Sequence, residues 1–131
     1  MIHSAEEFVA LRDSSLKDEY DRAATDEASV SVWKDVIDRF PDYRRWVAHN
    51  KTVPIEILRL LYQFGPDVRR FIAVKRKLSD ELFELLSTDL DATVRQGIAS
   101  NKKAPIPIIM RLMQDEDEDV SRIAKYNFES R

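Results

Sequence analysis

The sequence predicts an all-α fold, a short α-solenoid of about four degenerate 25-residue repeats of two helices each. Three segments with the same apolar pattern follow one another, so that Ala48, Ala73 and Ala99 stand one repeat apart. Only two of the 131 residues are glycine, which disfavours β-sandwiches and glycine-rich phosphate loops. Hydrophobic residues make up 44% of the chain, too many for a disordered protein. These observations together favour short helices joined by polar turns.

The first helix of each repeat is predicted from one apolar face. Tyr43, Trp46, Val47 and Asn50 follow one another at i, i+3, i+4 and i+7, which places them on the same side of an α-helix. We therefore expect Trp46 to pack in the core with Val47. The recurring alanine follows this face, where a small side chain lets two helices approach closely. Asn50 and Asn101 are expected to end their helices in the left-handed conformation that asparagine tolerates.

The second helix of each repeat is expected to begin at Pro54, Ser79 or Pro105. Proline at the first helical position loses no hydrogen bond, and serine caps a helix with its side chain. These helices are short, about 8–10 residues, and marginal on their own, so stacking of neighbouring repeats must bury their apolar residues. The apolar residues that recur are Ile57, Leu58, Leu61, Leu82, Phe83, Leu86, Ile108, Ile109 and Leu112.

The two ends of the chain are predicted to hold atypical repeats of one continuous domain. Residues 1–40 form an N-terminal cap and a degenerate repeat, residues 41–115 three clear repeats, and residues 116–131 a partial C-terminal repeat. Terminal repeats must present a polar outer face, which accounts for their divergence. Residues 4–22 are expected to form the N-terminal capping helix, with three apolar side chains pointing inward: Phe8, Leu11 and Leu16.

The pattern of the third clear repeat resembles a known family. Val94-Arg95-x-x-Ile98-Ala99-x-Asn101, followed by Pro105 and paired aliphatic residues, resembles the leucine-rich repeat variant group of HEAT-like bacterial helical repeats. The resemblance covers roughly residues 41–126 and implies a right-handed superhelix, leaving open whether some helices are 3-10. The preceding repeat departs from it, with a lysine in place of the asparagine and a serine in place of the proline. The resemblance implies no reaction, because helical repeats mainly present surfaces to other macromolecules.

The net charge of −3 conceals a segregated distribution. Residues 1–40 hold 5 basic and 10 acidic side chains, residues 41–103 hold 12 and 8, and residues 104–131 hold 4 and 6. The basic excess therefore lies in the repeats. It includes two lysine-rich turns, Lys75-Arg76-Lys77 and Lys102-Lys103, which we expect to face an acidic partner protein. The candidate partner-binding residues are Arg45, Arg70, Lys75, Arg76, Lys77, Lys102 and Lys103.

Two further interpretations of the repeated charges remain open. The first is structural, a ladder of surface ion pairs, because Arg44, Arg69 and Arg95 stand close to Asp42, Asp67 and Asp91. The second is nucleic-acid binding by a HEAT-like fold. An acidic chain gives a weak field for phosphates, so nucleic acid is the less favoured partner.

The residues required for catalysis are sparse. Cysteine is absent, the two histidines are His3 and His49, and no serine has a GxSxG context. Trp46 with Asp42 and Arg45 loosely fits a HEAT-like base-excision enzyme, but core packing of Trp46 is favoured. The acidic run at residues 115–119 lacks the glycine and glutamate of a calcium loop and is expected to be solvated and to favour the next helix N-terminus. We expect no enzyme activity, no metal and no cofactor.

The sequence thus favours a non-catalytic protein-protein interaction module that acts as an adaptor, an inhibitor or an immunity-type binder. The alternative is a nucleic-acid-binding HEAT-like protein. Without a visible secretory signal or an apolar run long enough for a membrane span, we expect a cytoplasmic bacterial protein that does not contact a membrane. The partner, the binding face and the oligomeric state are left open.

Overall fold

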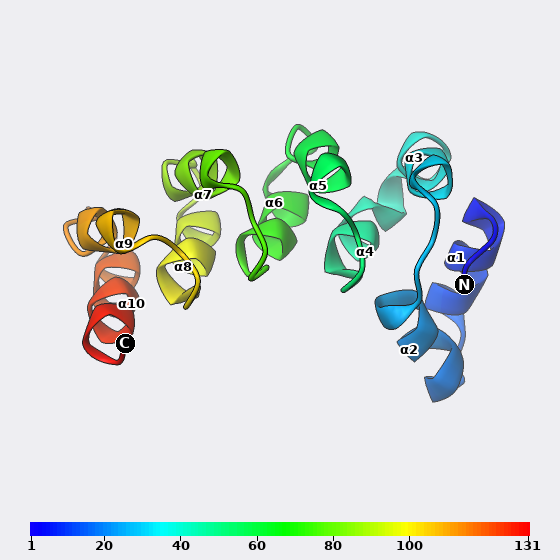
Figure 1. The fold of residues 1–131 in the computed structure, drawn as a ribbon, viewed down its shortest axis with the longest axis horizontal. Coiled ribbons are helices and arrows are strands. Elements are labelled where there is room, and N and C mark those ends of the chain that lie inside the picture. The colour runs from blue at the N-terminus through cyan, green and yellow to red at the C-terminus, as the bar shows by residue number, and fades with distance from the viewer. The chain divides into compact units, whose positions relative to one another are not determined.

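The structure is a computed structural model that describes residues 1–131 (Figure 1). It is all-α, as the sequence predicts. Its regular structure consists of ten α-helices and one 3-10 helix, and an isolated bridge between Ile2 and Ala28 is its one β contact. The chain divides into two compact units, an N-terminal unit (Met1–Val68) and a C-terminal unit (Arg69–Arg131). None of the helices has the length and apolar character needed to cross a lipid bilayer.

The N-terminal unit is built around a pair of aromatic rings. Phe8 and Trp33 are both completely buried and meet edge to face, with 5.2 Å between their ring centroids. Such edge-to-face pairs stabilise a core beyond the area they bury. The helices of this unit are α1 (Ala5–Asp13), α2 (Lys17–Thr25), α3 (Val30–Arg39), η1 (Pro41–Tyr43), α4 (Arg44–His49) and α5 (Ile55–Leu61).

The prediction of one capping helix over residues 4–22 is wrong, because the chain breaks there into α1 and α2. Ser14 follows α1 in an extended conformation, and its hydroxyl accepts from the backbone N–H of Leu16 and donates to Glu19. These local side-chain bonds compete with the helix. Phe8 and Leu11 are buried as predicted, whereas Leu16 lies in the break and is 63% exposed.

Three helices of the C-terminal unit are capped at their N-termini by side chains. The Ser79 hydroxyl accepts from the backbone N–H of Leu82, which confirms the predicted cap, and Asp91 and Asp117 cap their helices in the same way. The unit boundary falls within α6 (Pro66–Ala73). The remaining helices are α7 (Asp80–Ser87), α8 (Ala92–Ser100), α9 (Ile106–Leu112) and α10 (Glu118–Glu129).

The recurring alanines occupy the helix contacts that the sequence predicts for them. Ala48, Ala73 and Ala99 are all 0% exposed. Gly97 of α8 packs still more closely, because a Cβ atom at this position would lie 2.7 Å from the Cβ of Ala73. The absence of a side chain at Gly97 is therefore what allows α8 to approach Ala73.

Two helices begin one residue later than predicted, at Ile55 and Ile106. Pro54 and Pro105 are not the first helical residues of α5 and α9 but the N-cap residues that precede them. Each carbonyl accepts the first intrahelical hydrogen bond, from Leu58 and Ile109 respectively. An N-cap residue contributes its carbonyl and needs no N–H, so proline is accommodated there.

The prediction of left-handed asparagines is also wrong. Asn50 and Asn101 have φ values of −59° and −78°, and no residue other than glycine has a positive φ. Both are buried, as is Asn127, and the side-chain amides of all three donate to backbone carbonyls 24 to 28 residues earlier in the chain. Asn50 binds the carbonyls of Ala23 and Asp26. Asn101 binds those of Ala73 and Lys75, and Asn127 binds those of Ala99 and Asn101. We call these bonds the asparagine ladder.

Candidate functional site

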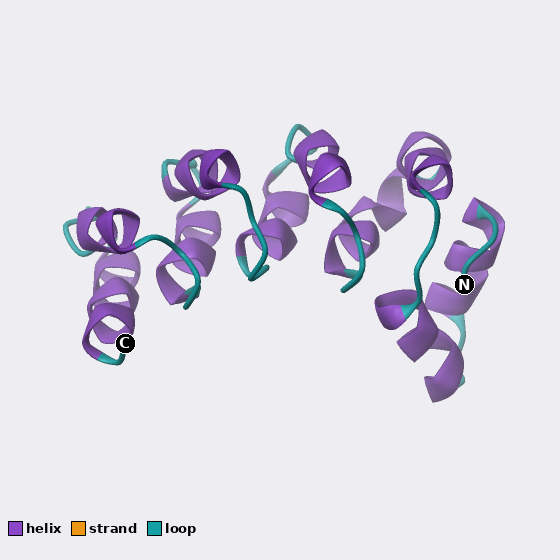
Figure 2. Ribbon diagram, viewed as in Figure 1, coloured by secondary structure: helices purple, strands orange, loops and turns teal.

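The two lysine-rich turns of the C-terminal unit lie next to each other. They connect α6 to α7 and α8 to α9, and Figure 2 shows both connections as loops that follow similar paths. The asparagine ladder joins them, because the Asn101 amide donates to the carbonyl oxygen of Lys75 at 2.6 Å. The same Asn101 side chain accepts from the backbone N–H of Lys103 at 2.9 Å, which fixes the shape of the second turn.

Four of the predicted residues on these turns form one basic surface, which we call the basic edge: Arg76, Lys77, Lys102 and Lys103. All four are exposed, as predicted, and none of their side chains takes part in an ion pair or a hydrogen bond. Unpaired surface cations of this kind keep their full charge available to a partner.

Arg131 adds a cation that could not be predicted at this place from the sequence pattern. Its guanidinium donates to the carbonyl oxygens of Ala104 at 2.7 Å and Asn101 at 3.0 Å. The C-terminal residue therefore lies against the turn that carries Lys102 and Lys103. Only the folded chain reveals this, because Arg131 follows the last repeat and belongs to no repeated position.

Lys75 differs from its neighbours on the turn. It occupies the repeat position at which Asn50 and Asn101 form the asparagine ladder, and it is half-buried. Burial lowers the pKa of Lys75 to about 8, well below the ordinary value of lysine. Lys75 therefore presents less charge to solvent than Arg76 or Lys77.

The remaining two predicted residues do not join the basic edge. Arg70 is exposed, but its guanidinium is paired with the carboxylate of Asp91 at 3.1 Å. Arg45 belongs to the N-terminal unit, where its guanidinium lies 5.2 Å from the ring centroid of Trp46.

The repeated arginines are paired, but with other partners than the sequence predicts. Arg69 binds Asp89 at 2.5 Å and Arg95 binds Asp115 at 2.9 Å, in each case a residue 20 positions downstream rather than a neighbour. These pairs are largely buried, with Asp89 only 3% and Asp115 10% exposed. The hydrogen bond to Asp115 raises the pKa of Arg95 above its usual value.

Asp91, the predicted partner of Arg95, binds other groups: it pairs with Arg70 and caps a helix. Asp91 accepts from the backbone N–H groups of Thr93 and Val94 at the start of α8, as an N-cap residue does. Arg44, the first arginine of the series, has no acidic partner. Its Nε donates to the carbonyl of Ile37, and its guanidinium lies 3.9 Å from the ring centroid of Phe64.

The acidic run at residues 115–119 has a structural role. Asp115 binds Arg95, and Asp117 accepts from the backbone N–H groups of Asp119 and Val120 at the start of α10. The predicted support of the next helix is thereby confirmed. No group of three or more histidine, aspartate or glutamate side chains is arranged to hold a metal ion.

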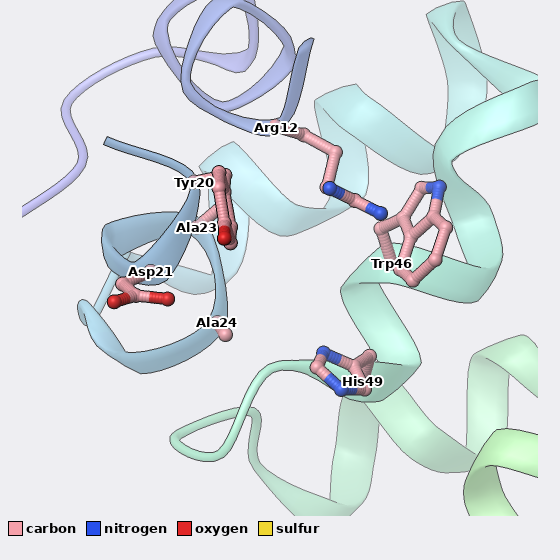
Figure 3. Close-up of a pocket in the computed structure, with 7 residues that line it drawn as sticks. All are labelled: Arg12, Tyr20, Asp21, Ala23, Ala24, Trp46 and His49. Atoms are coloured by element: carbon pink, nitrogen blue, oxygen red, sulfur yellow. The ribbon is translucent and has the colours of Figure 1, made fainter. Parts of the chain in front are cut away.

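A cavity of about 280 Å³ lies in the N-terminal unit, between α1, α2 and α4 (Figure 3). It corrects the prediction that Trp46 packs in the core, because the ring is only partly buried and forms one wall of this cavity. The guanidinium of Arg12 covers the ring at 3.6 Å from its centroid. Such a cation–π contact favours a tryptophan near the surface. The residues that line the cavity are Arg12, Tyr20, Asp21, Ala23, Ala24, Trp46 and His49.

The geometry thus offers two features for binding, the basic edge and the cavity beside Trp46. Sequence reasoning found most of the first from its charges. It missed the second, because Arg12 and Tyr20 come from α1 and α2, which lie outside the clear repeats. In comparisons with known proteins, the chain matches no protein-family model, no curated protein and no solved structure.

Proposed function

We propose that this protein is a non-catalytic binding module, an adaptor or an inhibitor, that docks an acidic segment of another protein on its basic edge. The observation that carries the proposal is the contrast among its cations. Arg69, Arg70 and Arg95 are neutralised by aspartates, whereas the four cations of the basic edge are exposed and unpaired on two adjacent turns.

The electrostatics favour an acidic protein over nucleic acid. The whole chain carries a charge of −3, which repels the long, uniformly charged backbone of DNA or RNA. A short acidic segment needs to contact only the basic edge. Opposite charges at such a surface speed the encounter and select the partner more than they add to affinity.

The scaffold we propose for this surface is a short right-handed α-solenoid of about four repeats, similar to the leucine-rich repeat variant and HEAT-like families. The spacing of Ala48, Ala73 and Ala99 supports it, as does the asparagine ladder, in which three asparagines bind backbone carbonyls 24 to 28 residues earlier in the chain. In this arrangement each repeat contacts only its neighbours, so turns of the same kind recur along one edge.

The test is a binding titration with defined probes. A fluorescein-labelled deca-glutamate peptide and a labelled single-stranded DNA of the same charge are titrated with the protein, and fluorescence anisotropy is recorded at low and at physiological salt. We expect the peptide to bind more tightly than the DNA. The K102E/K103E variant should weaken peptide binding by about tenfold or more, and adding R76E/K77E should weaken it further.

The matched control is the K34E/K125E variant. Lys34 and Lys125 are exposed and unpaired like the residues of the basic edge, so the net charge changes by the same amount. This variant should bind the peptide within about twofold of the wild type, apart from general charge effects. Equal losses in both double variants would refute a docking edge, and tighter binding of the DNA would replace the acidic protein with nucleic acid.

A further inference from the structure

The cavity of the N-terminal unit contains a cation without a partner. The Nε atom of Arg12 is buried and makes no hydrogen bond, and its guanidinium forms no ion pair with the protein. A guanidinium carries five N–H donors, and leaving a buried one unsatisfied is costly. Its stacking on Trp46 orients the group but satisfies none of these donors.

The carboxylates closest to this site in the sequence bind other groups. Asp13, the neighbour of Arg12, accepts from the hydroxyl of Tyr43. Asp21 lines the cavity but is paired with Lys17 at 2.7 Å, and Figure 3 shows its carboxylate pointing away from Arg12. The chain therefore supplies no anion for the Arg12 guanidinium.

The other walls of the cavity combine apolar and aromatic groups with the polar side chains of Asp21 and His49. Ala23 and Ala24 contribute methyl groups, and Tyr20 and Trp46 contribute aromatic rings on two sides (Figure 3). Apolar and aromatic walls with a few polar groups are the usual form of a small-molecule site, and the guanidinium of Arg12 gives this one a permanent positive charge. A carboxylate matches the planar guanidinium fork, and a hydrocarbon body matches these walls better than the hydrated oxygens of free phosphate do.

We infer that this cavity binds a carboxylate that carries a short apolar or aromatic body, with Arg12 as its anion partner and the rings of Tyr20 and Trp46 beside the body. The carboxylate belongs either to a free small acid or to the C-terminus of a peptide with an apolar last residue. The inference goes beyond the proposed function, because the site uses none of the four residues of the basic edge.

The test is a titration followed by the indole N–H signals in proton–nitrogen NMR spectra. The chain has two tryptophans, so W46F assigns both signals, and Trp33, which is completely buried, serves as an internal reference. We expect 3-phenylpropionate to shift the Trp46 signal in a saturable way. The uncharged 3-phenylpropionamide should bind at least about tenfold more weakly. The peptide Gly-Ser-Gly-Phe with a free C-terminus is titrated in the same way, with its C-terminal amide as the control. If this peptide binds more tightly than 3-phenylpropionate, the natural ligand is a peptide C-terminus, and if it binds more weakly, the ligand is a free small acid.

The variants R12M and R45M separate the site from the general charge. Both remove one positive charge near Trp46, but only Arg12 lines the cavity. R12M should reduce carboxylate binding by about tenfold or more, while R45M stays within about twofold. R12K, which keeps the charge and loses the planar fork, should bind several-fold more weakly than the wild type and tests the site if R12M does not fold.

Three results would overturn the inference. The amide could bind as tightly as the acid, inorganic phosphate could compete as well as 3-phenylpropionate, or R12M could bind like the wild type. The basic-edge variant R76E/K77E/K102E/K103E should bind 3-phenylpropionate like the wild type, so failure of this site and failure of the proposed docking edge remain distinguishable.

Discussion

At the scale of single residues, three buried asparagine side chains satisfy backbone carbonyls at the end of an earlier helix. The amide of Asn101, at the end of α8, donates to the carbonyls of Ala73 and Lys75, which lie at the end of α6 and just beyond it. Carbonyls at a helix end lack intrahelical partners, and a buried one is costly if unsatisfied. The recurrence of asparagine at the end of the first helix is explained by these bonds and not by a left-handed backbone.

Lys75 interrupts this series, and its burial predicts a pH dependence of stability. Burial lowers its pKa from 10.5 to about 8, so between these values the unfolded chain holds a proton that the folded protein has released. The contribution of Lys75 to the free energy of unfolding therefore rises with pH across this window, and below pH 8 the folded state bears the full cost of burying the charge. We expect K75M to be more stable than the wild type by about 1 kcal/mol at pH 7, after allowance for the exposed part of the side chain.

The measurement is urea unfolding of the wild type and K75M at intervals from pH 7 to pH 10.5. Taking the difference between the two proteins removes the titration of all other groups. The advantage of K75M should shrink as the pH rises through this range. A difference that stays constant with pH would mean that Lys75 titrates normally, and K77M, at an exposed lysine on the same turn, should show no advantage at any pH.

At the scale of elements, the close approach of α8 to Ala73 depends on Gly97. Alanine favours a helix over glycine by about 1 kcal/mol, so propensity alone predicts that G97A stabilises the protein. The added Cβ would lie 2.7 Å from the Cβ of Ala73, well inside van der Waals contact. Because a packed core does not yield easily, we expect G97A to lower the free energy of unfolding by about 1–3 kcal/mol in chemical denaturation.

The double variant A73G/G97A provides the control for this prediction. It moves the missing methyl group from α8 to α6 and removes the clash, so it should recover part of the stability lost in G97A. The stability change of the double variant should therefore differ from the sum of the two single changes, which is expected for residues in direct contact. If G97A proved as stable as the wild type, α8 would have room to shift, and the packing at Ala73 would not set the helix spacing.

The helices could be predicted from the sequence, but the pairing of their charged side chains could not. A period of 25 or 26 residues and a 3.6-residue apolar pattern identified most of the helices and the buried alanines, because the buried residues recur at these spacings. The partner of Arg95 is Asp115, 20 residues away on the following turn, while the closer Asp91 is used as a helix cap. The spacing of residues in the sequence cannot show which aspartate Arg95 binds, because Asp91 and Asp115 each pair with an arginine about 20 residues earlier.

At the scale of the whole molecule, the two candidate sites differed in how far they could be predicted. Arg76, Lys77, Lys102 and Lys103 were identified because charge clusters on turns stay exposed in almost any helical fold. The cavity was not, because it needs Arg12 of α1 to meet Trp46 of α4. No periodicity in the sequence relates these two positions, which lie 34 residues apart.

The proposed solenoid predicts the size of the molecule in solution. Repeats that contact only their neighbours extend the chain along one axis, so the radius of gyration should exceed the roughly 14 Å of a compact domain of this length. Small-angle X-ray scattering over a range of protein concentrations measures this value and separates an extended monomer from a dimer. A monomer with a radius of gyration near 14 Å would contradict the proposed solenoid, even with every helix in place. The two turns of the basic edge would still lie side by side in that case, because the hydrogen bond from Asn101 to the carbonyl of Lys75 joins them without any solenoid.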